Sequence, residues 1–402
     1  MRSPYLLSVP IALSCITAML ATDLYLPAVP DLYRTLGGAP SDGQYTLASC
    51  IAGFSAGQLF VGPLGDRYSK RKIMIVSLMI FAGASLLCAL ADTMGMLIAL
   101  RGVQGFASAA GVALAPAMVR ELGDDQTTVK LIGFINSIQA VVPALAPAAG
   151  VWLVAAYGWK ATFFMISAAA LLVAFVFALM PSRPSPHPGK LDSPLVTYMK
   201  LLTSRRFIAY TLGHGFGIGA LMTFIFAAPY LMTNLFGRDM DSFVWMQAFL
   251  IGSFIISSNL GAPFVKRVGM PTAIVCGSLV QLGGGLALLG LVALNPAPST
   301  AMLVMAMIPV NVGLGLRAGA TFASAMSHAN GPPGSTGALM IFIVSLVMSI
   351  GTAIVAPFLH LGAWTVGFAV VAQLVLSLAA LIYAVGPGVL VRPQPKPAVQ
   401  SA

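Results

Sequence analysis

The chain has 402 residues, of which 58% are hydrophobic and only 8% are charged. A soluble domain carries about 25% charged residues, so a water-soluble enzyme or nucleic-acid-binding protein is excluded. The mean hydropathy of +0.92 indicates that a lipid bilayer surrounds most of the protein. The net charge of +10 comes from short basic clusters between apolar runs, so no nucleic-acid partner is expected. The four cysteines lie in apolar runs without a CxxC pair, and neither a metal site nor a cofactor is predicted.

Apolar runs recur along the whole chain, and a membrane-spanning helix needs roughly 20 mostly apolar residues. In chain order the runs cover residues 5–27, 44–64, 73–91, 95–119, 131–154, 160–180, 207–230, 243–264, 271–293, 299–321, 335–358 and 363–385. The first run is too long for the apolar region of a cleavable signal and lacks a small-residue cleavage site, so we predict a spanning helix there. The sequence therefore predicts an all-α integral membrane protein with 12 transmembrane helices.

One long polar stretch, residues 181–206, is rich in proline and basic residues and divides the 12 predicted spans into six and six. Such a pattern indicates a duplicated six-helix unit. We predict an N-terminal six-helix bundle over residues 1–180, a cytoplasmic linker over 181–206, a C-terminal six-helix bundle over 207–386 and a cytoplasmic tail over 387–402. The two bundles are expected to be pseudo-symmetric.

The predicted orientation follows from the positions of lysine and arginine, because the cytoplasmic loops of membrane proteins hold an excess of both. With the N-terminus inside, 16 of the 21 basic residues lie in cytoplasmic loops and flanks, and only Arg34, Lys160 and Arg238 lie outside. An even number of spans then places both termini in the cytoplasm.

Asp23 is the only acidic residue that must lie within a predicted span, roughly 6–10 Å below the outer end of the first helix. Ionisable groups at such depth normally mark ion or substrate pathways. Arg101 lies about as deep in the fourth span, so an Asp23–Arg101 pair is compatible with the sequence. A carboxylate in that position can exchange a proton for a cargo molecule. The alternative is a permanent ion pair that only holds two helices together.

Three further polar residues of the C-terminal spans are candidates for a cavity or for coupling. Arg317 lies towards the cytoplasmic end of its span, and we expect it to extend to the interface rather than to contact cargo or a gate. His214 lies between two glycines and is expected to pack or to hydrogen-bond, with proton coupling as the alternative. Asn311 faces either a central cavity or a neighbouring helix.

The loop after the second predicted span carries an acidic residue followed at once by a cluster of cations. Asp66 stands at the cytoplasmic helix end, and Arg67, Lys70 and Arg71 follow it. These charges can hold two helices together while the cytoplasmic side is closed and release them as the halves move. The alternative is that the cations only set the topology.

Four segments resemble motifs of the major facilitator superfamily. Residues 62–72 are similar to its cytoplasmic loop signature, and residues 97–105 resemble the helix-4 RxxQG motif of its drug/proton antiporters. Residues 22–30 are close to the helix-1 motif of the Bcr/CflA-type multidrug-resistance branch, and residues 143–150 resemble the helix-5 antiporter motif. The candidate site residues within these segments, besides those named above, are Tyr25, Gly62, Gln104, Pro143, Pro147 and Gly150.

The resemblance implies the major facilitator fold and a proton-coupled exporter of small amphipathic or apolar compounds, such as antibiotics, that works by alternating access. It implies Asp23 and Arg101 as the coupling residues, and cargo, protons and the lipid bilayer as the partners. It also implies a monomer in a bacterial cytoplasmic (inner) membrane. Ser69, Ala146 and Ala149 stand where the motifs normally have glycine.

Three alternative functions are a transporter of a physiological solute, a membrane-embedded enzyme and a sensor. A transporter of the same fold for a physiological metabolite, siderophore or sugar, running as an exporter or as a proton symporter, stays open. A membrane-embedded enzyme would need clustered titratable groups, whereas one aspartate, one histidine and two arginines are dispersed over four predicted spans. A sensor would normally carry a sizeable soluble domain, which this sequence lacks.

Overall fold

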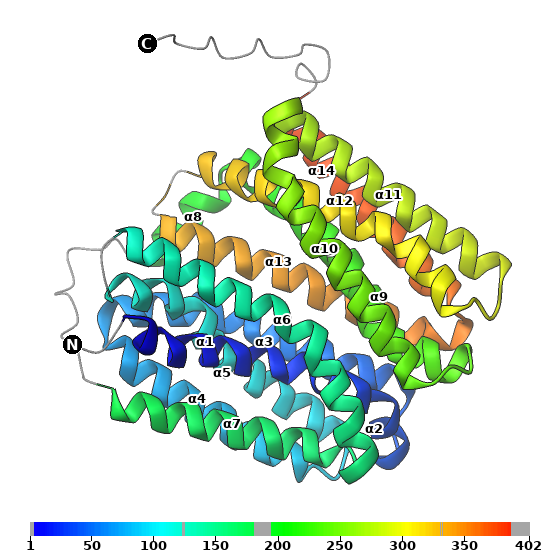
Figure 1. Ribbon diagram of the computed structural model, residues 1–402, viewed down its shortest axis with the longest axis horizontal. Helices are drawn as coiled ribbons and strands as arrows, with labels where there is room; N and C mark the ends of the chain where they lie inside the picture. The colour runs from blue at the N-terminus through cyan, green and yellow to red at the C-terminus, as the bar shows by residue number, and fades with distance from the viewer. Residues whose placement is uncertain (1–3, 123–124, 181–193, 330, 332, 387–402) are drawn as a thin grey trace.

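The computed structural model describes residues 4–122, 125–180, 194–329, 331 and 333–386, and the regular structure over these residues is entirely helical (Figure 1). The helices up to the predicted linker, here called the N-terminal half, are α1 (Pro4–Asp23), η1 (Leu26–Ala28), α2 (Val29–Thr35), α3 (Pro40–Arg67), α4 (Lys70–Ala89), α5 (Met94–Arg120), α6 (Asp125–Tyr157) and α7 (Lys160–Leu179). Those after it, the C-terminal half, are α8 (Pro194–Leu202), α9 (Arg205–Tyr230), η2 (Leu231–Leu235), α10 (Met240–Val268), α11 (Met270–Leu294), α12 (Thr300–Ser327), α13 (Pro333–Val355), η3 (Ala356–Leu361) and α14 (Trp364–Val385).

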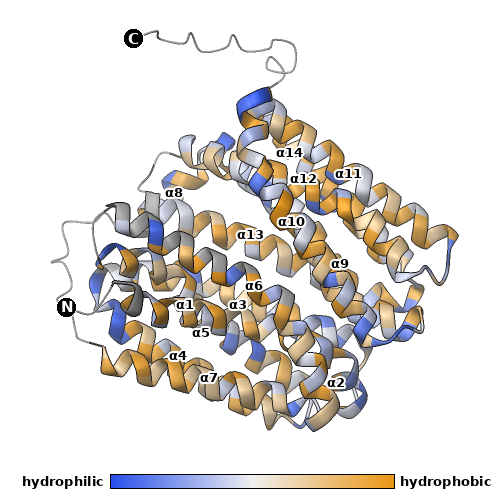
Figure 2. Cartoon of the chain, viewed as in Figure 1, coloured by the Kyte–Doolittle hydropathy of each residue, from blue (hydrophilic) through white to orange (hydrophobic). Residues whose placement is uncertain are grey.

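Within the described residues, 11 helices are long and apolar enough to cross a membrane, and α6 adds the shorter apolar stretch Val141–Tyr157. Hydrophobic residues run along these helices, and hydrophilic residues are found mostly near their ends (Figure 2). Large apolar side chains such as Leu294, 88% exposed, and Met305, 71% exposed, are what a lipid-facing surface requires. The predicted all-α membrane architecture is confirmed.

The first span is longer than predicted. Instead of ending at residue 27, the apolar helical segment covers Leu7–Thr35 and includes the 3-10 turn η1. Pro27 and Pro30 do not end the span, because each lies in the first two positions of a helical segment, where proline is tolerated. Asp23 therefore lies roughly 18 Å from that end of the span, which is deeper than expected from the sequence.

The predicted linker contains a helix that the sequence analysis did not foresee. Helix α8 packs against α9 and α13, and its residue Leu201 is fully buried. The polar residues 181–193 and the predicted tail 387–402 lie outside the described residues.

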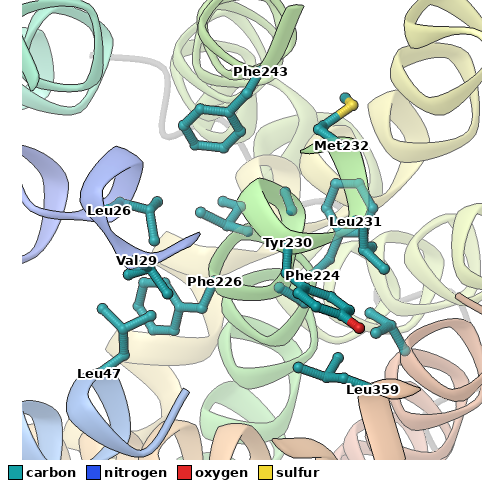
Figure 3. Packing of buried hydrophobic residues seen from close by; sticks show 14 of the residues in the cluster. Leu26, Val29, Leu47, Phe224, Phe226, Tyr230, Leu231, Met232, Phe243 and Leu359 are labelled. Carbon is teal, nitrogen blue, oxygen red and sulfur yellow. The ribbon is translucent and has the colours of Figure 1, made fainter. Parts of the chain in front are cut away.

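The buried hydrophobic residues separate the two ends of the molecule. At the far end, opposite the linker, one cluster joins both halves, and Phe226 of α9 points towards Val29 and Leu47 of the N-terminal half (Figure 3). At the linker end, a cluster around Phe177 belongs to the N-terminal half and another around Phe207 belongs to the C-terminal half. The buried core is thus shared between the halves at the far end, whereas among the described residues at the linker end only the partly buried Leu59 of α3 packs against the cluster of the other half.

Hydrogen bonds reinforce the junction between the halves. The Gln44 side chain donates to the carbonyl of Phe226 at 2.9 Å, and both residues are buried. Ser349 of α13 donates to the carbonyl of Ala48 of α3 at 2.8 Å. At the rim, Asn234 accepts from Arg34 at 2.6 Å. These bonds tie α2 and α3 to α9, η2 and α13.

Candidate functional site

Arg101 is the centre of a buried polar network in the N-terminal half. Its side chain is fully buried, and Nη1 donates to the carbonyl of Ala21 at 2.7 Å and to Gln104 Oε1. Arg101 and Gln104 are three residues apart and share one face of α5. Gln104 passes the network on by donating to Ser85 Oγ at 2.7 Å. The guanidinium carbon lies 4.3 Å from the ring centroid of Tyr25, a cation–π contact.

Tyr25 is a packing residue as well as a partner of this cation. It is fully buried, its hydroxyl lies 2.6 Å from Thr46 Oγ1, and its ring centroid lies 5.1 Å from that of Phe163. The contacts join the first span to α3, α5 and α7. The structure therefore brings together three candidates from two different motifs: Tyr25, Arg101 and Gln104.

Asp23 does not pair with Arg101. Within the described residues the only salt bridge joins Lys70 and Glu121. Arg101 lies at the same depth as Asp23, as predicted, because it donates to the carbonyl of Ala21 and stacks on Tyr25, and these two residues flank Asp23. Asp23 and Arg101 do not pair because Asp23 lies on another face of the helix. Ala21 and Tyr25 are four residues apart on the face towards Arg101, and Asp23 points about 200° away from Ala21.

The face that carries Asp23 is partly exposed. Asp23, Leu20 and Ile16 follow one another at helical spacing, and each of them is half-buried, whereas Ala21 and Tyr25 are fully buried. The carboxyl group is thus placed in the interior of a span without being enclosed by helices on all sides.

Arg317 does not extend to the interface as predicted. It is fully buried, with Nε 3.1 Å and Nη2 2.7 Å from Gln281 Oε1, and Nη2 3.1 Å from Ser377 Oγ. The space comes from Gly217 of α9, where an added Cβ would overlap Nη2. The prediction was wrong because burial here depends on missing side chains of other helices, which the position of Arg317 in its own helix does not indicate.

The two other C-terminal candidates have different surroundings. His214 is buried on α9, three residues from Gly217 and therefore on the face that Arg317 approaches. Asn311 is buried and donates to the carbonyl of Met307 at 3.1 Å, one turn back in its own helix. The structure thus places His214 on the face of α9 that borders Arg317. The amide of Asn311 instead bonds within its own helix, α12.

The cations of the loop signature bind within the N-terminal half. Lys70 Nζ lies 2.8 Å from Glu121 Oε1, which joins the start of α4 to the end of α5. Arg71 donates to the carbonyls of Phe177 at 2.8 Å and Ala178 at 2.6 Å, at the end of α7. Basic side chains are favourable at a helix C-terminus, where carbonyls lack partners. Neither of these bonds holds the two halves together.

The remaining loop candidates are only partly described. Asp66 belongs to the last turn of α3, but its side chain lies outside the described residues, and its gating role stays a prediction. Arg67 is exposed at the end of the same helix. Gly62 is half-buried, and a Cβ there would lie 3.9 Å from the hydroxyl of Tyr198 on α8.

The helix-5 motif lies where α6 meets the first span. Helix α6 continues through both Pro143 and Pro147. Gly150 is buried, and an added Cβ would overlap the carbonyl of Leu24 and lie 3.2 Å from Pro27. This glycine allows α6 to approach the turn that follows Asp23.

Several residues that complete these networks were missed or unassigned in the sequence. Ser85 and Ser377 are hydroxyls in apolar spans, and Gln44 lies at the start of another span. Gln281 was one of several intramembrane amides without an assigned partner. In the sequence each of these residues is visible only as a polar side chain within an apolar run. Such a side chain needs a hydrogen-bond partner, but the sequence does not indicate which helix provides it.

Two sets of membrane helices joined across one end, each with a buried polar network, are the arrangement of a membrane transporter, and the family match assigns the chain to that class rather than to the enzymes. The sequence matches the model of the Major Facilitator Superfamily over residues 11–356, and the chain belongs to this family. No group of three or more His, Cys, Asp or Glu side chains that could hold a metal is found in the described part of the chain.

Curated relatives cover most of the chain at low identity. The uncharacterized MFS-type transporter YdgK of Bacillus subtilis is 28% identical over 86% of this chain and 88% of its own length. The bicyclomycin resistance protein homolog of Haemophilus influenzae is 28% identical over 73% of this chain and 72% of its own. The multidrug resistance protein MdtL of Escherichia coli is 25% identical over 91% and 92%.

Solved structures share the fold. A bacterial homolog of the human lysosomal transporter Spinster, in an inward-facing and unoccupied conformation, matches with a TM-score of 0.71 and 16% identity over 96% of this chain and 98% of that one. A D-xylose-proton symporter matches with a TM-score of 0.71 and 15% identity over 94% and 97%. At these identities the likeness establishes the fold of a multi-pass membrane transporter.

Proposed function

We propose that this chain is a proton-coupled exporter of small amphipathic or apolar compounds, antibiotics among them. The observation that carries the proposal is the position of Asp23, a half-buried carboxyl group in the interior of a span that turns away from the buried Arg101. Asp31, Asp42 and Asp241, the other acidic residues in the described spans, lie within five residues of a span's end. Asp23 is therefore the carboxyl group best placed to hold a proton within the membrane.

The names of the relatives support export of such compounds. Two of them, at 28% and 25% identity, are named for resistance to bicyclomycin and to multiple drugs. In the proposed cycle the Asp23 carboxylate takes up a proton from the outside and releases it to the cytoplasm, while cargo leaves in the opposite direction. The partly exposed face with Ile16 and Leu20 borders the cargo path and provides apolar contact.

The division of the core between the ends supports alternating access. Apolar side chains such as Phe226 and Leu231 seal the far end together with Leu26 and Val29 (Figure 3). At the linker end the buried members of each cluster belong to one half, and among the described residues of these clusters only the partly buried Leu59 of α3 packs against the cluster of the other half. We assign the structure to the state that is closed outwards, in which the loop cations Lys70 and Arg71 bind only their own half.

The orientation is proposed from the basic loops: the linker end faces the cytoplasm of a bacterial cell and the far end faces outwards. Reporter fusions after residues 190 and 395 should report a cytoplasmic location, and a fusion at Arg34 should report the outside. An outside signal after residue 190 contradicts the orientation.

The function is tested in cells that lack their major efflux pumps. Expression of the chain should raise the tolerated concentration of at least one amphipathic antibiotic in a panel, and a protonophore should abolish accumulation differences between expressing and empty-vector cells. Unchanged susceptibility across the panel, with the protein present in the membrane, contradicts the proposal. Uptake of a sugar or metabolite driven by the same gradient would instead identify a symporter.

A further inference from the structure

Arg317 is a buried cation whose partners within the described residues are all neutral. The acidic residues of the C-terminal half are Asp239 and Asp241, both exposed at the start of α10, at the far end. Arg317 lies on α12, which begins at the far end with Thr300, so it is roughly 25 Å along the helix from that end. No carboxylate of its own half can therefore neutralise its charge.

The neutral groups around Arg317 are already engaged. Gln281 Oε1 accepts from Nε and Nη2, while the amide nitrogen of Gln281 donates to the carbonyl of Gly217 at 3.0 Å. Ser377 Oγ lies 3.1 Å from Nη2 and donates to the carbonyl of Gly213 at 2.6 Å. An amide and a hydroxyl provide hydrogen bonds but no negative charge, and an uncompensated buried charge is costly.

Two buried nitrogens remain without a partner on the same side of α9. Arg317 Nη1 and His214 Nδ1 have no hydrogen-bond partner within the described residues. His214 and Gly217 lie three residues apart on one helix face, and Arg317 fills the space beside Gly217. The Nη1 group of Arg317 and the Nδ1 nitrogen of His214 are both free of hydrogen bonds to the described residues, and together they are a suitable donor set for an anion.

We propose that Arg317, with His214 beside it, is an anion-binding site of the C-terminal half that takes a single negatively charged group. The group is either the carboxylate of an amphipathic cargo or an inorganic anion, and both provide the missing counter-charge. The proposal rests on the exporter function for the identity of the cargo and extends it, since such an exporter prefers acidic or neutral compounds to cationic ones.

The site is tested by thermal unfolding of the purified, detergent-solubilised chain, which requires no transport. Sodium chloride is titrated into a low-salt buffer, with the response of Arg317→Gln to the same salt as the control for ionic strength, and benzoate is compared with benzamide, its neutral counterpart. We expect a saturable rise of the unfolding temperature with chloride, or with benzoate but not benzamide. A chloride response identifies an inorganic anion, and a benzoate response alone identifies a cargo carboxylate. No rise with either anion, or equal rises with benzoate and benzamide, overturns the proposal.

Substitutions locate the response. Arg317→Gln should abolish it, and Lys266→Gln, which removes an exposed charge, should leave it intact. If Arg317→Gln does not fold, Gly217→Ala keeps the charge but displaces the guanidinium and should weaken the apparent anion affinity at least about tenfold. Gly283→Ala is its matched control, because a Cβ at Gly283 meets nothing within 4 Å. A response that survives at Arg317→Gln or is unchanged at Gly217→Ala contradicts the site, whether or not the chain exports drugs.

Discussion

The two halves of the molecule each bury one arginine on the fourth span of the half but satisfy it differently. Arg101 has a backbone carbonyl, a glutamine amide and the face of Tyr25, while its Nε and Nη2 have no hydrogen-bond partner within the described residues. Arg317 has the amide of Gln281 and the hydroxyl of Ser377, and it is absent from the cation–π contacts of the described residues. The fourth span of each half thus provides a different environment for the same charge.

The acidic residues differ in the same way. The N-terminal half places Asp23 at the level of its arginine, whereas the C-terminal half keeps Asp239 and Asp241 at the surface. We infer that the N-terminal half handles the proton and the C-terminal half recognises the anion. A duplicated fold permits this division because each half packs its own helices around its own polar network.

The largest expected effect is at Asp23. Asp23→Asn keeps the size of the side chain but removes its proton site, so uphill efflux driven by a pH gradient should fall at least about 100-fold while the protein stays folded. Asp31→Asn, at an exposed position of the same span, is the matched control and should keep full activity. The measurement is gradient-driven transport in proteoliposomes. Full efflux by a folded Asp23→Asn variant would direct the search for the proton carrier to His214.

The next largest effect is expected on the free energy of unfolding when each buried arginine is replaced by methionine. Arg101→Met removes the partner of a buried carbonyl, of Gln104 and of the Tyr25 ring, and should lower the free energy of unfolding by about 2–4 kcal/mol. Neither arginine has a carboxylate partner in the described residues, but Arg317→Met removes no cation–π contact, so its loss should be smaller by about 1 kcal/mol. Denaturant unfolding in micelles measures both. Equal losses would show that the two environments are energetically alike.

A smaller effect is expected where the halves meet. Gln44→Leu removes a buried hydrogen bond between the halves, worth about 1 kcal/mol, and should raise the population open at the far end about fivefold. Distances between spin labels at Thr35 and Arg238, in a background without the four native cysteines, report this opening. Gln58→Leu, which loses a bond to Ala109 within one half, should leave the distances unchanged.

The smallest effect concerns the surface acid Asp239. The hydroxyl and backbone N–H of Ser242 donate to its carboxylate and lower its pKa. A lowered folded-state pKa means that the stabilisation of the α10 start is present above the unfolded pKa and is lost as the pH falls through the lower folded value, below about pH 4. Amide exchange at residues 240–243 should rise there.

Two variants separate the charge from the cap. Asp239→Asn keeps a capping side chain but cannot titrate, so amide exchange at the start of α10 should lose its pH dependence. Asp241→Asn should behave like the unmodified chain. A pH-dependent loss of protection that persists in Asp239→Asn would assign it to another group.

Much of this architecture follows from the sequence. The apolar runs predict the spans and the basic loops distinguish the two ends, because the bilayer imposes length and charge rules on any chain. The motif residues Arg101, Gln104 and Tyr25 lie together in the structure, and Arg101 lies at the level of Asp23 as predicted, whereas their functional role stays a prediction. These properties depend on position along one helix, which a linear sequence contains.

The tertiary structure decided which side chains meet. Asp23 and Arg101 lie at one level of the membrane, yet Arg101 bonds the carbonyl of Ala21, and Asp23 lies on the opposite face of that helix. Arg317 is buried because Gly217, a hundred residues earlier in the chain, leaves room for it. The sequence by itself indicated a multi-span helical membrane protein and which spans carry charges, because both depend on composition along single segments. Helix rotation and packing, set by contacts between distant segments, decided how those charges are satisfied.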